Sequence, residues 1–134
     1  MDLYFGDVSL CYTNSLAMAL DSFGFRFRPE YLEALMVMGN GASVVEGDAE
    51  HPLVFFDNGH PDVSISNCLR ILGFEYEDFY VEGAAGLSAD DAWGRLQRML
   101  ANGPVVAGPL DMGCLTYNPN CQDLGGVDHF VCVC

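Results

Sequence analysis

The stretch from residue 6 to residue 24, GDVSLCYTNSLAMALDSFG, places a cysteine at the start of a predicted amphipathic helix. Its apolar side chains recur at the i, i+4, i+7 spacing of one helical face, at Leu16, Leu20 and Phe23. Ser9 suits the N-cap and Gly24 suits the C′ position, so we expect Cys11 in the first turn. The N–H groups of a first turn lack intrahelical partners, and the positive end of the helix dipole favours a thiolate. The position therefore suits a nucleophile.

A nucleophilic cysteine needs a base, and the best candidate is His129, at the far end of the chain in GGVDHFVCVC. Its imidazole would take the thiol proton, and the N–H groups at the helix start would hold the oxyanion of a tetrahedral intermediate. In the alternative interpretation Cys11 is a small buried hydrophobic residue, as free cysteines often are. His51 and His60 each precede a proline and belong to no spaced cluster, so we predict loop histidines there.

Composition and charge exclude several classes of function. The chain has 134 residues, of which 51% are apolar, so we expect one globular domain with its own core. Five basic residues against a net charge of −14 argue against nucleic-acid binding. No run approaches the roughly 18 apolar residues of a membrane span, and residues 1–10 do not resemble a secretory signal. We therefore expect no membrane association.

The six cysteines bear on location and on metal binding. Without an export signal they indicate reduced thiols and a cytoplasmic protein. No two cysteines have the C-x-x-C spacing, and the last two form only a C-x-C. A zinc site therefore has little support. We expect no metal and no cofactor.

Apolar spacing and punctuation by Ser, Pro and Gly predict one α+β or α/β domain over residues 1–134. Its helical part covers about 9–40 and 61–103, and its sheet part about 104–134. Ser88 and Asp91 have the spacing of a capping box, with Gly103 and Pro104 ending that helix. Strands are predicted at four alternating or apolar segments: 25–28, 74–80, 104–110 and 129–134. Residues 39–50 are predicted as a loop.

Three segments carry a resemblance to a known family: CYTNSL at 11–16, GPVVAGPLDMG at 103–113 with LTYNP at 115–119, and DHF at 128–130. In their order along nearly the whole chain they resemble the N-terminal domain of the butirosin-biosynthesis acyltransferase family. That family is similar to papain-like enzymes and to bacteriocin-processing cysteine peptidases. The resemblance implies a papain-like α+β fold, with Cys11 on the helical part as nucleophile and His129 on an antiparallel sheet as its base. It implies acyl transfer, or thioester or amide hydrolysis, on a small-molecule or carrier-bound acyl substrate.

This sequence departs from the papain-like pattern in two places. An Asn or Asp normally follows the histidine and orients it, but the sequence ends at Cys134. Asp128 is predicted to face the opposite side of the strand from His129, so Asp111 or Asn118 is the candidate for that role.

The second departure concerns the oxyanion. No Gln precedes Cys11 as a side-chain donor. Asn14, about one turn after it, is a candidate donor, or else an ordinary amide on the helix surface. Gly108, Gly113 and Tyr117 are expected to border the substrate, because glycines allow close backbone approach to a ligand. A strand end followed by a turn would also explain these glycines.

The predicted strand at 129–134 is the last one, so we expect the later strands of a papain-like sheet to be missing. An exposed apolar edge strand favours pairing with another chain, which predicts a homo-oligomer through this edge. Two functions remain open at this point. The first is a cysteine acyltransferase or hydrolase, and the second is a non-catalytic small-molecule- or protein-binding module of the same fold that lacks the third member of the triad.

Overall fold

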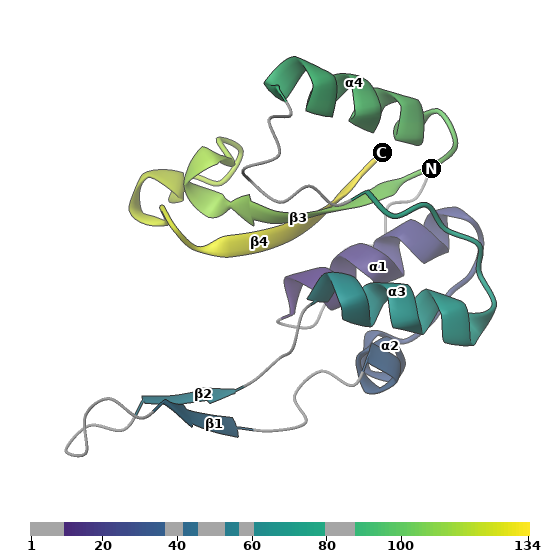
Figure 1. Ribbon diagram of the computed structural model, residues 1–134, viewed down its shortest axis with the longest axis horizontal. Coiled ribbons are helices and arrows are strands. Elements are labelled where there is room, and N and C mark those ends of the chain that lie inside the picture. The colour runs from purple at the N-terminus through teal and green to yellow at the C-terminus, as the bar shows by residue number, and fades with distance from the viewer. Residues whose placement is uncertain (1–9, 37–41, 46–52, 57–60, 80–87) are drawn as a thin grey trace. The chain divides into compact units, whose positions relative to one another are not determined.

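The computed structural model describes residues 10–36, 42–45, 53–56, 61–79 and 88–134 (Figure 1). Its elements in chain order are α1 (Cys11–Ser22), α2 (Pro29–Met36), β1 (Ala42–Val45), β2 (Leu53–Phe56), α3 (Pro61–Leu72), α4 (Ala89–Leu100), β3 (Val105–Asp111), the short 3₁₀ helices η1 (Met112–Cys114) and η2 (Cys121–Asp123), and β4 (Asp128–Val133). This mixture of helices and antiparallel strands confirms the α+β class. The chain divides into two compact units, one of Met1–Pro29 with Glu77–Cys134 and one of Glu30–Tyr76.

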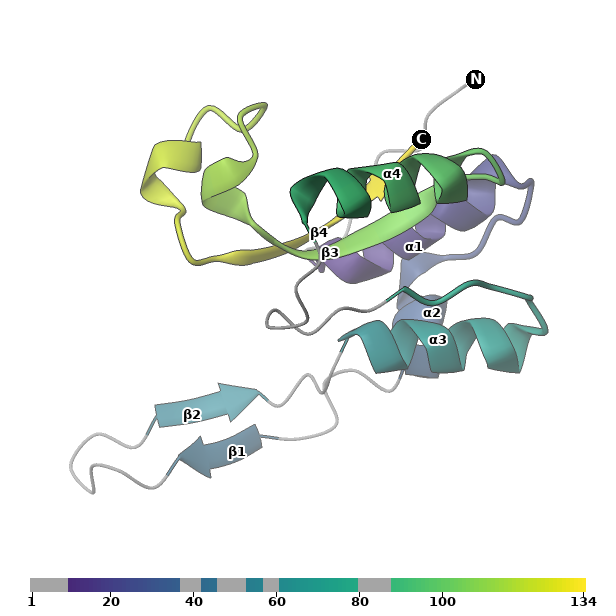
Figure 2. The same cartoon turned by 45° about the horizontal axis from the view of Figure 1, so that its top comes forward.

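The first unit is built on the antiparallel hairpin of β3 and β4. Helix α1 packs mainly against β4 and also contacts β3, while α4 contacts β3. The two helices lie on opposite sides of the hairpin: α4 lies above it and α1 below it in Figure 1, and α4 lies in front of β3 and α1 behind it in the turned view of Figure 2. The unit therefore has three layers, with the sheet in the middle.

Helix α1 supplies most of the buried side chains of this unit. Seven of its twelve residues are buried, at Tyr12, Thr13, Ser15, Leu16, Ala17, Ala19 and Leu20. The helix ends at Ser22, and Gly24 occupies the predicted C′ position with φ +85°. The N–H of Gly24 donates to the carbonyl of Asp21 and that of Phe25 to the carbonyl of Leu20, which together form a Schellman motif.

Phe130 on β4 joins the sheet to α1. It is buried, and its ring meets that of Tyr12 edge to face, with 6.2 Å between the centroids. On β3 the pairing shifts between Ala107 and Leu110, and Gly108 lies in that irregularity. A Cβ on Gly108 would lie 2.5 Å from the Phe130 ring, so the ring packs directly on the glycine backbone.

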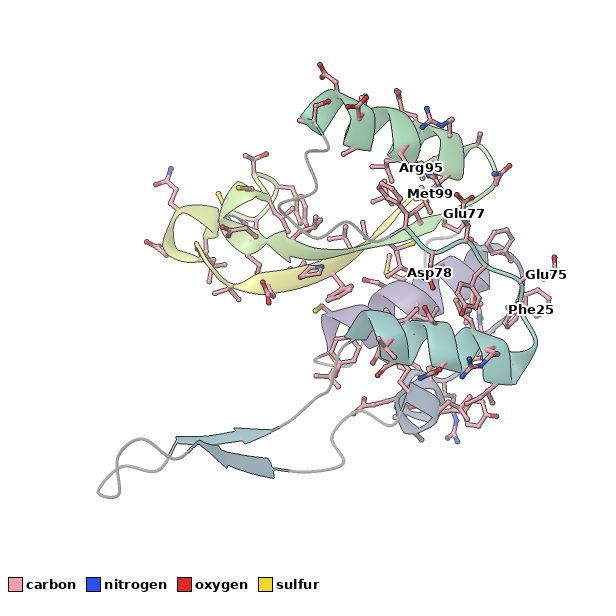
Figure 3. All side chains as sticks on the ribbon, viewed as in Figure 1. Phe25, Glu75, Glu77, Asp78, Arg95 and Met99 are labelled. Atoms are coloured by element: carbon pink, nitrogen blue, oxygen red, sulfur yellow. The ribbon has the colours of Figure 1, made fainter. Side chains whose placement is uncertain are left out.

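Helix α4 begins and ends where its sequence signals predict. The Ser88 hydroxyl accepts the backbone N–H of Asp91 over 3.1 Å, and Gly103 follows the helix with φ +149°. No residue of α4 is fully buried. Arg95 extends from the helix to an ion pair with Glu77, and its guanidinium lies 4.8 Å from the ring centre of Phe79 (Figure 3).

The second unit contains α2, the antiparallel hairpin of β1 and β2, and α3. Pro29 and Pro61 are the first residues of α2 and α3, because proline suits the first position of a helix. Gly73, at φ +78°, ends α3 with the same two capping hydrogen bonds as α1. Cys68 of α3 is fully buried.

Three sequence expectations on secondary structure are wrong or incomplete. Residues 25–28 and 74–79 alternate like strands but form none, and Tyr80 lies outside the described residues. Strand β1 interrupts the predicted loop at 39–50. Alternation reports which side chains are apolar, whereas a strand also needs a hydrogen-bonding neighbour, which one segment cannot reveal.

Candidate active site

Cys11 is the first residue of α1, as the sequence predicts. Leu10, in an extended conformation, occupies the N-cap position and provides no side-chain cap. Ser9, the predicted N-cap, lies outside the described residues. The first backbone hydrogen bond of the helix runs from the N–H of Asn14 to the carbonyl of Leu10. Cys11 therefore stands at the positive end of the helix dipole, among N–H groups that the helix itself does not use.

The sulfur of Cys11 lies against strand β4. The backbone N–H of Phe130 donates to Sγ of Cys11 over 3.4 Å, and the thiol is half-buried. This bond joins the two ends of the chain that the sequence predicts to act together.

His129 is the residue immediately before Phe130 on β4. It pairs with Leu110 of β3 in the ladder and is half-buried. Successive side chains of a strand point to opposite faces, so the imidazole leaves the strand on the face opposite the Phe130 ring. The structure thus places the Cys11 sulfur at the peptide that links His129 to Phe130.

Asn14, the candidate oxyanion donor, lies in α1 three residues after Cys11. Residues with this spacing are neighbours on a helix surface, and Asn14 is half-buried. The structure therefore places this amide on the same side of the helix as the thiol.

The two candidate orienting residues have other local hydrogen bonds. The Oδ1 atom of Asp111 accepts the N–H of Gly113 over 2.8 Å and that of Gly126 over 3.1 Å. The Oδ1 atom of Asn118 accepts the N–H of Asn120 over 3.0 Å. Within the described ranges, neither side chain forms a hydrogen bond to His129. Both oxygens therefore stabilise the loop between β3 and β4.

The three residues expected near the substrate have different surroundings. Gly108 lies under the Phe130 ring, as described above. Gly113 lies where a Cβ would come within 2.9 Å of the Gly125 backbone. Tyr117 is 71% exposed on the loop between η1 and η2. Gly108 is thus the one of the three that packs against the Cys11–Phe130 contact.

The other thiols differ from Cys11 in their surroundings. Burial raises the pKa of the Cys68 thiol to about 11. Burial, followed by the charge of nearby Cys134, raises the pKa of Cys132 to about 11. Both thiols stay protonated near neutral pH and are poor nucleophiles.

No three His, Cys, Asp or Glu side chains come together as a metal site in the part of the chain that the structure describes. Among the same residues, no helix has the length and apolar character required to cross a bilayer.

The backbone N–H of Phe130 is the element of the site that the sequence interpretation missed. The alternation in HFVCVC places Phe130 on the face opposite His129. It does not reveal that the edge of the strand meets the start of α1. The sequence offers one local signal for this contact. An aromatic residue follows each candidate, Tyr12 after Cys11 and Phe130 after His129, and these two rings pack together.

Comparison with curated proteins identifies a longer relative of this chain. The chain is 40% identical over 131 residues to the uncharacterized protein YobF of Bacillus subtilis (strain 168). The match covers 98% of this chain and 40% of YobF, so the chain spans about two fifths of that relative's length. No protein-family model and no solved structure match the sequence. The chain is therefore similar to one region of a longer protein.

Proposed function

We propose that this protein transfers or hydrolyses acyl groups through a thioester on Cys11. The observation that supports it most is the position of Cys11, at the start of α1 with its sulfur 3.4 Å from the backbone nitrogen of Phe130. The start of a helix leaves backbone N–H groups without intrahelical partners, and these groups can bind the oxyanion of an acyl intermediate. His129, one residue away along β4, is the candidate base.

In the proposed reaction His129 takes the proton of the Cys11 thiol. The thiolate attacks the carbonyl carbon of a thioester or amide, and the first-turn N–H groups, with Asn14 as a further donor, bind the oxyanion. The tetrahedral intermediate expels the thiol or amine, which receives the proton from His129. Water or an amine then attacks the acyl-enzyme, His129 takes the proton of that nucleophile, and Cys11 is released with its proton restored.

We also propose a papain-like arrangement for the first unit. Its support is an early helix that begins with the nucleophile and packs on an antiparallel hairpin that carries the base. This is the arrangement that the sequence resemblance implies. Gly113, Tyr117 and Asn118 would border the substrate from the loop after β3.

The charge of the chain bears on the substrate. Residues 99–134, which include β3 and β4, contain no lysine or arginine, while three aspartates occur there, at Asp111, Asp123 and Asp128. Acidic surfaces repel one another, so an acidic carrier protein is a poor electrostatic match. We therefore propose a small-molecule acyl donor in preference to a carrier-bound one, and a cytoplasmic location in which the six free thiols stay reduced.

A homo-oligomer through the edge of the sheet remains part of the proposal. The sheet of the first unit consists of β3 and β4. On the edge of β4 that faces away from β3, the N–H of Phe130 already donates to the sulfur of Cys11. Pairing with a second copy would therefore use β3 or the last residues of β4. Light scattering after size-exclusion chromatography checks this, since a monomer at all concentrations contradicts it.

The second candidate function is a binding module without catalysis. The observation in its favour is that Asp111 and Asn118 bind backbone N–H groups in place of His129. Without an orienting partner an imidazole is a weaker base.

The rate of iodoacetamide labelling at each cysteine between pH 5 and 9, mapped by peptide mass, separates the two functions. In the enzyme, Cys11 labels faster than half-buried Cys121 near neutral pH. His129→Ala slows the labelling of Cys11, and His60→Ala, as the control, leaves its rate unchanged. Labelling of Cys11 at the rate of Cys121 contradicts the proposal. The enzyme also forms an acylated Cys11 from a simple alkyl thioester, and Cys11→Ala abolishes turnover.

A further inference from the structure

One carboxylate oxygen closes the loop that joins β3 to β4. The Oδ1 atom of Asp111, the last residue of β3, accepts the N–H of Gly113 over 2.8 Å and that of Gly126 over 3.1 Å. Beside it, the N–H of Met112 donates to the carbonyl of Val127 over 2.9 Å. We call the three residues Asp111, Gly113 and Gly126 the Asp111 clasp. It holds both ends of the segment 112–127 at one atom.

The backbone around the clasp is closely packed. A Cβ on Gly113 would lie 2.9 Å from Cα of Gly125 and 3.1 Å from the Asp111 oxygen. Gly126 has φ +79°, a conformation that side chains disfavour. Gly113 therefore permits the close approach of the two ends of the loop, and Gly126 permits the positive φ at the second end.

The clasp adjoins the candidate site through the register of the hairpin. Asp111 pairs with Asp128, and the next pair of the ladder is Leu110 with His129. Like charges directly opposite each other destabilise an antiparallel pair. The two hydrogen bonds that Asp111 accepts offset this repulsion at the point where β4 begins. The clasp therefore fixes the start of β4 two residues before Phe130.

We propose that Asp111 is a positioning residue for the Cys11 site, acting through β4. The clasp holds the beginning of β4, and β4 in turn holds the His129 backbone and the Phe130 N–H at the sulfur of Cys11. In this role Asp111 touches neither substrate nor thiol, in contrast to the orienting role predicted from the sequence. The positioning role of Asp111 rests on the proposed function. The hydrogen bonds of the Asp111 clasp do not depend on that function.

Two substitutions separate the hydrogen bonds of Asp111 from its charge. Asp111→Asn keeps an oxygen that accepts both N–H groups, and Asp111→Ala removes it. Asp111→Glu keeps the charge but displaces the oxygen by one methylene, and it replaces the alanine variant should that variant fail to fold. Asp123→Ala, at an exposed aspartate on the same loop, is the matched control for loss of a charge.

Two readouts are measured on the full chain: hydrogen exchange at the amides of Gly113 and Gly126, and the pH profile of Cys11 alkylation. In Asp111→Ala we expect exchange at both glycines to accelerate about tenfold, as for the loss of one hydrogen bond. We expect its Cys11 profile to move toward that of His129→Ala. Asp111→Asn and Asp123→Ala should keep both readouts within about twofold of the parent.

Each other outcome contradicts a distinct part of the proposal. Fast glycine exchange with an unchanged Cys11 profile shows that the clasp does not position the site. An Asn variant that behaves like the Ala variant shows that charge, not hydrogen bonding, is decisive, and overturns the clasp mechanism. Slow labelling of Cys11 in the parent overturns the proposed function and the positioning role together, while glycine exchange still decides whether the clasp closes the loop.

Discussion

The backbone N–H of Phe130 donates to the sulfur of Cys11 over 3.4 Å, across 119 positions of sequence. The same phenylalanine packs its ring on Tyr12, the neighbour of Cys11, and on the backbone of Gly108. A single residue of β4 therefore contacts the candidate nucleophile through its main chain and packs against α1 through its side chain. The packing around this ring should consequently affect both stability and thiol reactivity.

Gly108→Ala tests this connection. The new Cβ would lie 2.5 Å from two atoms of the Phe130 ring, so the ring must move. Overpacking of this kind costs about 1–3 kcal/mol of unfolding free energy, and the displaced strand should slow alkylation of Cys11. Gly94→Ala in α4 is the control, because its Cβ meets nothing closer than 3.7 Å and alanine favours the helix. Equal urea midpoints for the two variants would show that the packing of the Phe130 ring does not require a glycine at position 108.

Arg95 should hold α4 to the rest of its unit. It pairs with Glu77 and lies 4.8 Å over the ring of Phe79, while no residue of α4 is fully buried. We expect Arg95→Gln to lower the opening free energy of α4 by about 0.5–1 kcal/mol, since these contacts are partly exposed. Hydrogen exchange of the α4 amides measures this effect. Arg98→Gln, at an exposed arginine of the same helix, should change it less, and equal protection in both variants would refute the anchoring role.

Structural features that depend on residues close together in the sequence can be predicted from it, whereas features that depend on distant segments cannot. The sequence predicts helix α4 correctly because each of its ends carries its own local signal, the cap of Ser88 on Asp91 at the start and Gly103 after the end. Segments 25–28 and 74–79 alternate like strands but form none, because strand formation depends on a neighbour elsewhere in the chain.

The same distinction holds for the candidate site. The sequence alone places Cys11 in a first turn and His129 on a strand, because both positions follow from local patterns. The contact between Cys11 and Phe130 depends on the packing of α1 against β4, which no local pattern reports. The hydrogen bonds of Asp111 likewise depend on the return of the loop to Gly126, 15 residues later.

Removal of the N-cap of α4 gives a test of local stability. The Ser88 hydroxyl accepts the Asp91 N–H and donates to the Asp91 carboxylate over 2.6 Å. Ser88→Ala leaves that N–H without its acceptor and should destabilise the helix by about 0.5–2 kcal/mol. Protection of the first-turn amides of α4 against hydrogen exchange is the measurement. Ser88→Thr keeps the hydroxyl and should retain most of the protection; a loss as large as in Ser88→Ala would argue against the cap.

The buried thiol of Cys68 should lower the free energy of unfolding as the pH rises above 9. Its thiol is fully buried, and burial raises its pKa from 9.0 to about 11. Between these values the unfolded chain loses the thiol proton while the folded chain keeps it, so unfolding becomes more favourable as pH rises. The loss should reach about 2 kcal/mol by pH 11. Urea unfolding at pH 8 to 11 measures it against Cys68→Ala, which lacks this contribution; parallel pH profiles for the two proteins would contradict the assignment.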